Sequence, residues 1–288
     1  MGSVQAADRA LTAFMTGHFL DGGGSALARD ARFGDILLET KLDGDRENKM
    51  PLSRAALTGF LKACPGQSKD GWPIEMVWDL ALDLLNRGLA THSAAVVLGA
   101  DGYFRPCELR RLKVGDVSRP APRVNSRYAG EWTILVCQWA NETPTKAGVF
   151  DDSIKVGIGD RGWVKGVLSA LAGSRNDEDY LLPLPVNSLS KEMRVSALRL
   201  GYEDCDHSPH ILRHSGPGND RWQDVLSLPE IMKRGRWASL KSVSRYEKHG
   251  RLLKILNKMT ARQQGRMRKS SELSPRLATR ALCALSWK

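Results

Sequence analysis

Apolar residues recur with helical period from Trp72 onward. Pro73 opens the clearest of these segments and Gly88 closes it, and the apolar residues between them fall on one helix face. The next stretch, His92–Tyr103, is almost entirely small and apolar, which predicts a buried helix. Another helix is expected to open at Pro106. Helical patterns continue over Arg161–Ala172, Val186–Leu200, Ile211–Arg221, Leu228–Arg234 and Leu240–Leu256.

The pattern changes in the middle of the chain. Glu131–Trp139 (EWTILVCQW) and Ser153–Ile158 (SIKVGI) are rich in β-branched and apolar residues, and each predicts a strand. Lys146 lies in the connection between them, close to Gly148. The sequence therefore predicts an α+β protein that is mainly helical, with a small antiparallel sheet that carries a lysine at its turn.

The N-terminal residues have a weaker pattern. Gly22-Gly23-Gly24 interrupts any helix. We expect helices over Arg32–Lys41 and Ser53–Cys64, the second capped by Ser53. The expected organisation is a short helical N-terminal region, a main domain and a basic C-terminal tail, at residues 1–70, 71–258 and 259–288.

Positive charge is concentrated near the C-terminus. Ile231–Lys288 holds 16 lysines and arginines against two acidic residues, whereas the remaining residues hold 27 basic and 30 acidic ones. A basic segment on a nearly neutral body favours a polyanionic partner. Charge alone does not distinguish DNA from RNA or an anionic membrane, and beyond Met259 a solvated, disordered tail is the alternative.

Composition disfavours a membrane or secreted protein. The chain has no run of 18 or more apolar residues, and its N-terminus lacks a basic start followed by a long apolar stretch. The five cysteines are scattered and include no C-x-x-C motif, which favours free thiols in a reducing intracellular compartment.

Several residues that can act on a phosphate follow one another along the main domain. Each taken alone has an ordinary explanation, such as a solvated arginine, a packed tyrosine or a histidine at a helix start. Together they form an ordered set: Arg105 with Glu108 three residues later, Lys146, the H-x-x-R quartet from His210 to Arg213 followed by His214, Trp237 in Gly235-Arg236-Trp237, and Tyr246. In this order, and with Tyr246 nine residues after Trp237, the chain resembles the catalytic domain of the tyrosine recombinase (phage integrase) family. The segments LRHSGP, RGRW and SVSRYEKHGRL are most similar to the recombinase-like proteins of dinoflagellate and other algal genomes.

The resemblance implies the tyrosine recombinase catalytic-domain fold and DNA cleavage through a 3′-phosphotyrosyl intermediate. Tyr246 would be the nucleophile, since a phenol can form a reversible covalent link to phosphorus. Arg105 and Arg213 would clamp the phosphate, because a planar guanidinium matches its oxygens. Lys146 would protonate the leaving oxygen. Lys155 and Lys165 are the alternatives for that role.

The remaining candidates would assist this chemistry. His210 stands one helical turn before Arg213, so both can face one phosphate. Trp237 can donate its indole N–H to a phosphate oxygen or pack against the nucleophile's helix. Glu108 and His214 would support the site. In the family the position of Trp237 is usually a histidine and sometimes a tryptophan.

The resemblance also implies partners and surroundings. The expected partner is double-stranded DNA, bound by a homotetramer on paired sites, with no metal, nucleotide cofactor or membrane. The protein would be intracellular and DNA-associated, in the nucleus if eukaryotic. Region 1–70 would be a truncated form of the family's helical core-binding domain.

Three alternatives remain open at this stage. The chain could be a decayed mobile-element remnant that only binds DNA, or a strand nickase resembling type IB topoisomerases. A zinc site is the third alternative. Its spacing fits no common structural pattern and Arg213 would repel a cation, which disfavours the four candidate ligands, Cys205, His207, His210 and His214.

Overall fold

The computed structural model describes residues 4–24, 27–31, 50–63, 71–121, 123, 130–136, 152–173, 175–246 and 249–277. The chain divides into two compact units, Met1–Ser68 and Lys69–Lys288. Among the described residues, no helix has both the length and the apolar character needed to cross a bilayer.

In the described part of the first unit, α1 (Val4–Leu20) packs against α3 (Pro51–Ala63). Met15 and Phe60 of these helices are buried in one cluster with Ala28, which lies in the helical residues 27–31. Asp8 of α1 accepts the backbone N–H groups of Leu52 and Ser53, at 3.0 and 2.8 Å. Because Asp8 satisfies these first-turn donors, and the Ser53 hydroxyl instead donates to the Met50 carbonyl at 3.4 Å, the prediction that Ser53 caps this helix is wrong. The helix expected over Arg32–Lys41 lies outside the described residues.

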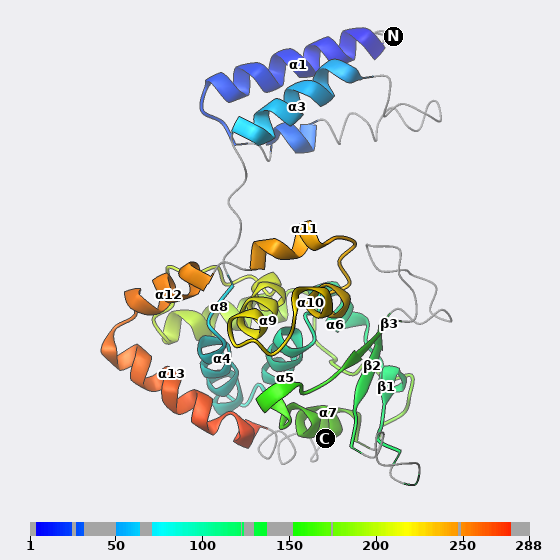
Figure 1. Ribbon diagram of the computed structural model, residues 1–288, viewed down its shortest axis with the longest axis vertical. Helices are drawn as coiled ribbons and strands as arrows, with labels where there is room; N and C mark the ends of the chain where they lie inside the picture. The colour runs from blue at the N-terminus through cyan, green and yellow to red at the C-terminus, as the bar shows by residue number, and fades with distance from the viewer. Residues whose placement is uncertain are drawn as a thin grey trace. The chain divides into compact units, whose positions relative to one another are not determined.

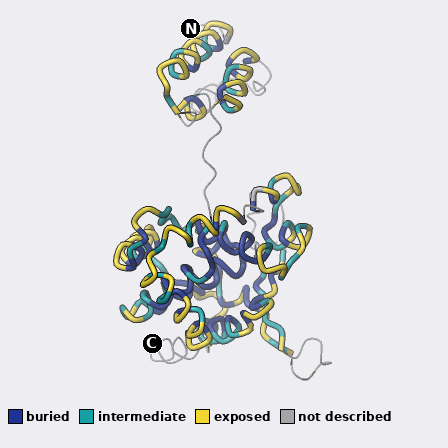
Figure 2. Tube along the Cα trace, turned by 60° about the vertical axis from the view of Figure 1, so that its left-hand side comes forward, coloured by how far each residue is buried: buried dark blue, intermediate teal, exposed yellow. Residues whose placement is uncertain are grey.

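The second unit is organised around three helices that pack on one another, α4 (Ile74–Asn86), α5 (Ala90–Asp101) and α9 (His210–Trp222). Figure 1 shows α5 and α9 in the interior of this unit, and the core in Figure 2 is correspondingly dark. The helix predicted over His92–Tyr103 is confirmed as α5, and every residue from Ser93 to Asp101 is buried. Gly216 lets α9 approach α5 closely, because a side chain there would collide with the Ala100 carbonyl and the Tyr103 ring.

The sheet is antiparallel and has the order β1-β2-β3, with β1 at Val117–Ser118, β2 at Thr133–Val136 and β3 at Asp152–Lys155. Ile134 pairs with Ile154, and both side chains face the core. The two predicted strands are therefore confirmed in part of their expected length. Strand β1 was not predicted, because two residues are too short to show a period. The mainly α architecture with a small antiparallel sheet is confirmed.

The other helices surround this centre: α6 (Pro106–Arg111), α7 (Val164–Ala172), α8 (Ser188–Arg199), α10 (Leu228–Arg234), α11 (Leu240–Val243), α12 (His249–Lys258) and α13 (Ala261–Leu273). Short 3₁₀ turns occur at Val114–Asp116, Gly159–Arg161 and Ser244–Tyr246. The single helix predicted over Leu240–Leu256 is wrong. The segment instead divides into α11, the 3₁₀ turn and α12, and Val243 and Tyr246 are buried together in one cluster.

Part of the expected basic tail is helical. Helix α13 packs against α4, where the buried Asp79 carboxylate accepts hydrogen bonds from Arg266 Nε and Ser270 Oγ, both at 2.7 Å. The arginine that would otherwise add to a solvated positive tail is therefore paired with a core carboxylate.

Candidate functional site

Arg105 and Glu108 lie at the first turn of α6. Pro106 occupies the first helical position, where its missing N–H is not needed, so Arg105 becomes the N-cap residue. Glu108 accepts the Arg105 backbone N–H at 2.7 Å, and its other oxygen pairs with Arg105 Nη1 at 2.5 Å. The guanidinium of Arg105 is thereby held beside a buried carboxylate while its side chain stays 17% exposed.

Arg213 reaches the same carboxylate from the interior helix α9. Its Nη1 donates to the Tyr103 carbonyl and its Nη2 to the Gly235 carbonyl, the latter at 2.5 Å. Its distance to Glu108 is 3.9 Å. The two arginines expected to clamp a phosphate, far apart in the sequence, are brought together by one glutamate.

Arg236 is a third arginine of this cluster, and the sequence analysis did not single it out. Its Nη2 pairs with Glu108 at 2.7 Å and donates to the Tyr103 carbonyl at 3.2 Å. Its backbone is left-handed, with φ at 54°. The sequence contains no stronger signal for this residue than a basic side chain directly before Trp237.

The cluster carries an excess of positive charge. Burial together with the neighbouring Arg105 and Arg236 lowers the pKa of Arg213 to about 10, so it remains protonated at neutral pH. Burial alone would raise the pKa of Glu108, but Arg236 and the backbone N–H of Arg105 outweigh it and hold that pKa below its ordinary value. Three guanidiniums and one ionised carboxylate form a site suited to an anion such as a phosphate.

Tyr246 lies beside the arginine cluster and packs with Tyr103 and Trp237 in a separate hydrophobic cluster. The Arg213 guanidinium stacks over the Trp237 ring, 4.6 Å from its centroid, and the Trp237 and Tyr246 rings are 4.9 Å apart. Tyr246 is 8% exposed. The expected nucleophile and the expected clamp are thus separated by one aromatic ring.

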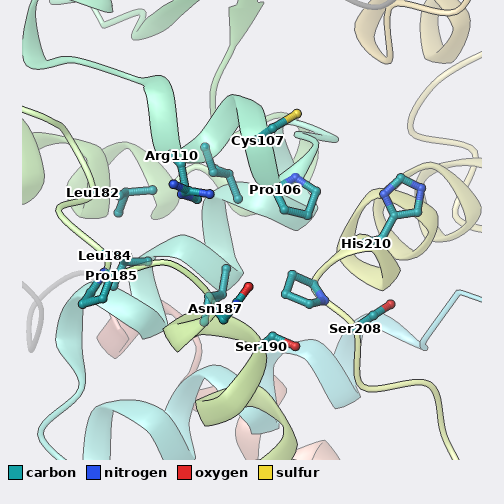
Figure 3. A pocket seen from close by; sticks show the side chains of 13 residues that line it. Pro106, Cys107, Arg110, Leu182, Leu184, Pro185, Asn187, Ser190, Ser208 and His210 are labelled. Atoms are coloured by element: carbon teal, nitrogen blue, oxygen red, sulfur yellow. The ribbon is translucent and has the colours of Figure 1, made fainter. Parts of the chain in front are cut away.

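Two histidines extend this row of rings along α9. The His214 ring is 5.5 Å from that of Tyr246, and the His210 ring is 5.0 Å from that of His214. His210 also lines a cleft of about 400 Å³ together with Pro106 and Cys107, the two residues that follow Arg105 (Figure 3). The His214 ring therefore contacts the Tyr246 ring, and His210 lies close to the start of α6.

The lysine of the expected set lies outside the described residues, since Lys146 falls between β2 and β3. Of its two alternatives, Lys155 Nζ pairs with Glu131 at 2.9 Å, and Lys165 Nζ approaches the same carboxylate at 3.4 Å. Both alternative lysines are thus directed to one surface glutamate.

A second group of buried charges lies close to Tyr103 and was also missed. Arg161 bridges Asp101 and Asp220, at 3.3 and 2.8 Å, and the Tyr103 hydroxyl donates to Asp220. Burial, reinforced by the charge of Asp220, raises the pKa of Tyr103 well above its ordinary value. This network anchors the residue whose carbonyl accepts hydrogen bonds from Arg213 and Arg236.

The zinc alternative has no support in the described part of the chain. No group of three or more His, Cys, Asp or Glu residues there is arranged to hold a metal ion. His207 instead approaches the Tyr202 carbonyl through Nε2 at 2.7 Å, and the His214 ring contacts Tyr246.

Comparison with known proteins gives a likeness of fold. No protein-family model and no curated protein sequence matches the chain. The XerH site-specific recombinase bound to difH substrate, in a pre-cleavage complex, has a TM-score of 0.51 and 14% identity over 88% of this chain and 70% of that chain. The post-cleavage complex of XerH on palindromic difH substrate has a TM-score of 0.56 and 16% identity over 87% of this chain and 72% of that chain. The chain therefore has the catalytic-domain fold of the tyrosine recombinases.

Proposed function

We propose that this protein is a site-specific tyrosine recombinase, which cleaves and rejoins double-stranded DNA through a phosphotyrosyl link at Tyr246. The observation that carries the proposal is the shared carboxylate of Glu108. It joins Arg105 and Arg213 into one cationic cluster, and Trp237 connects that cluster to Tyr246. An anion site beside a tyrosine is what cleavage of a phosphodiester by a phenol requires.

In the proposed reaction the Tyr246 oxygen attacks phosphorus, and the bond from phosphorus to the 5′ oxygen breaks. The phenol proton passes to an imidazole, for which His214 is the candidate because its ring contacts that of Tyr246. The leaving 5′ oxygen takes up a proton from Lys146. Arg105 and Arg213 stabilise the charge that develops on the non-bridging oxygens, and His210 and Trp237 donate to the same phosphate.

Rejoining is the reverse reaction with a different 5′ hydroxyl. Because the phosphotyrosyl link keeps the energy of the phosphodiester bond, this chemistry needs no nucleotide cofactor. We propose double-stranded DNA as the partner, and a homotetramer on two paired sites as the working assembly, since exchange of strands between two duplexes requires four cleavages.

Covalent trapping tests the proposal. The protein is incubated with nicked duplexes from the flanks of its genomic locus, so that the released strand diffuses away and an adduct accumulates. An adduct that survives denaturation is expected for the wild type and for Tyr180→Phe, a change at a tyrosine that is 56% exposed. It is expected to be absent in Tyr246→Phe and reduced about 100-fold or more in Arg213→Ala.

Covalent trapping and a plasmid-relaxation assay together separate the competing functions. DNA binding without an adduct on any flank would refute catalysis and favour a remnant that only binds DNA. Relaxation of a supercoiled plasmid that lacks the flanking sequences would instead favour a nickase of the topoisomerase type.

A further inference from the structure

Arg236 has a backbone conformation that is unfavourable for an arginine. It lies in the turn after α10 with φ at 54°, in the left-handed region that glycine adopts most readily. Non-glycine residues persist in such conformations when the surrounding structure fixes them, and they concentrate at functional sites. The arginine side chain is therefore expected to make interactions here that a glycine could not make.

Its guanidinium connects the two arginines of the candidate phosphate clamp. Through Glu108 Oε2, at 2.7 Å, it shares a carboxylate with Arg105. Through the Tyr103 carbonyl, at 3.2 Å, it shares an acceptor with Arg213. Its Nη1 also donates to the Arg234 carbonyl at 3.0 Å, so both ends of the fork are fixed.

Arg236 is the most enclosed of the three arginines. Its side chain is 0% exposed, compared with 3% for Arg213 and 17% for Arg105. Its Nε has no hydrogen-bond partner among the described residues, so a buried donor is left unsatisfied beside the cluster. Burying a third guanidinium costs free energy, which its ion pair with Glu108 has to offset.

We propose that Arg236 is a positioning residue that holds Arg105 and Arg213 in the geometry that binds a phosphate group. This inference rests on the proposed function, because it assigns Arg236 to the same site. It differs from a purely structural role, in which Arg236 would only fill space under the cluster.

Binding of inorganic phosphate tests the inference without DNA or cleavage. Phosphate is titrated while the unfolding temperature is followed, because a ligand that binds only the folded state raises it. The wild type is expected to respond, and Arg213→Ala to lose the response. Arg236→Gly, which relieves the backbone strain, is expected to need at least about tenfold more phosphate for the same shift. Asp224→Gly is the matched control, since Asp224 is also left-handed (φ 53°) but lies on the surface.

Each result of the phosphate titration either supports or overturns the positioning role of Arg236. An undiminished response in Arg236→Gly would overturn the inference, and so would a wild type that does not respond, because there would then be no anion site to hold. If Arg236→Gly fails to fold, Arg236→Lys takes its place. It retains a cation against Glu108 but lacks the planar fork that also reaches the Tyr103 carbonyl, so a response equal to that of the wild type overturns the inference.

Adduct formation gives the second test. Arg236→Gly is expected to slow it by 10- to 100-fold, on the order of the cost of a clamp misplaced by about 1 Å. In Arg213→Ala the same glycine substitution should slow adduct formation less than it does in the wild type, because only the link to Arg105 remains to be lost, whereas independent structural damage would multiply. If the wild type forms no adduct, the proposed function fails, and the phosphate titration still decides on Arg236.

Discussion

Replacing Glu108 by glutamine removes one charge from the centre of the arginine cluster and keeps its shape. The carboxylate is 7% exposed and accepts or pairs with Arg105, Arg236 and Arg213, at distances of 2.5, 2.7 and 3.9 Å. Removing one partner of a buried ion pair typically costs about 3–5 kcal/mol, since the remaining charges are left uncompensated. We therefore expect Glu108→Gln to lower the free energy of unfolding by about 3 kcal/mol.

Tryptophan fluorescence during urea unfolding is a suitable assay, because all eight tryptophans follow Ser68 and report only on the second unit. Glu131→Gln is the matched control. Glu131 also meets two cations, Lys155 and Lys165, but it is 31% exposed, so about 1 kcal/mol or less is expected. Equal losses in the two variants would refute the claim that Glu108 is the centre of the cluster.

The pH dependence of the stability difference between the wild type and Glu108→Gln provides a second check. Burial opposes ionisation of Glu108, but Arg236 and Arg105 prevail and its pKa in the folded protein lies below the ordinary 4.5. A lowered pKa contributes stability that is complete above the unfolded value and is lost as the pH falls through the folded one. The difference in the free energy of unfolding between wild type and Glu108→Gln should therefore stay constant down to about pH 5 and become smaller below pH 4.5. A difference that grew on acidification would contradict the assigned direction.

Three further perturbations probe the surroundings of the site. Tyr103→Phe removes a buried donor to Asp220 and should lower the free energy of unfolding by about 1–3 kcal/mol in the fluorescence assay, whereas Tyr180→Phe on the surface should not. Asp79→Asn removes the charge that pairs with Arg266 and should accelerate amide hydrogen exchange in α13 more than in α9; equal acceleration in both helices would argue against a local role. Lys146→Ala should slow cleavage of ordinary DNA far more than of DNA with sulfur at the 5′ leaving position, because a thiolate leaves without protonation, and the same pattern in Lys155→Ala would move the general acid to that residue.

The sequence was sufficient to predict elements whose residue types indicate that they are buried or mark where they begin. Helix α5 was predictable because nearly every residue is small and apolar, and α6 because Pro106 marks its first turn. The break before Tyr246 was not, since the segment from Leu240 to Leu256 keeps its apolar positions near helical spacing, and nothing in that spacing marks the 3₁₀ turn Ser244–Tyr246. Nor was the pairing of Arg266 with Asp79, which joins positions distant in the sequence.

The candidate site, too, could be predicted only in part. Arg105, Arg213, Trp237 and Tyr246 could be selected because their order resembles a known set. The atoms that hold the two arginines could not be selected from residue types, because two of the acceptors are the backbone carbonyls of Tyr103 and Gly235. A carbonyl is present at every position, so only its direction in the folded chain makes it part of a site.

That direction depends on backbone conformations that are unfavourable in isolation. The described residues include four non-glycine positions with positive φ, and two of them, Tyr103 and Arg236, lie in the arginine cluster. Each such residue costs on the order of 1 kcal/mol or more and persists only where other interactions determine it. For Tyr103 these are its buried hydroxyl on Asp220 and its ring against Trp237. For Arg236 the interaction is the ion pair with Glu108. The strained residues and the clamp arginines therefore depend on each other. Relieving the strain at Arg236 with glycine should lower the affinity of the cluster for an anion, whereas the same substitution at Asp224 should leave that affinity unchanged.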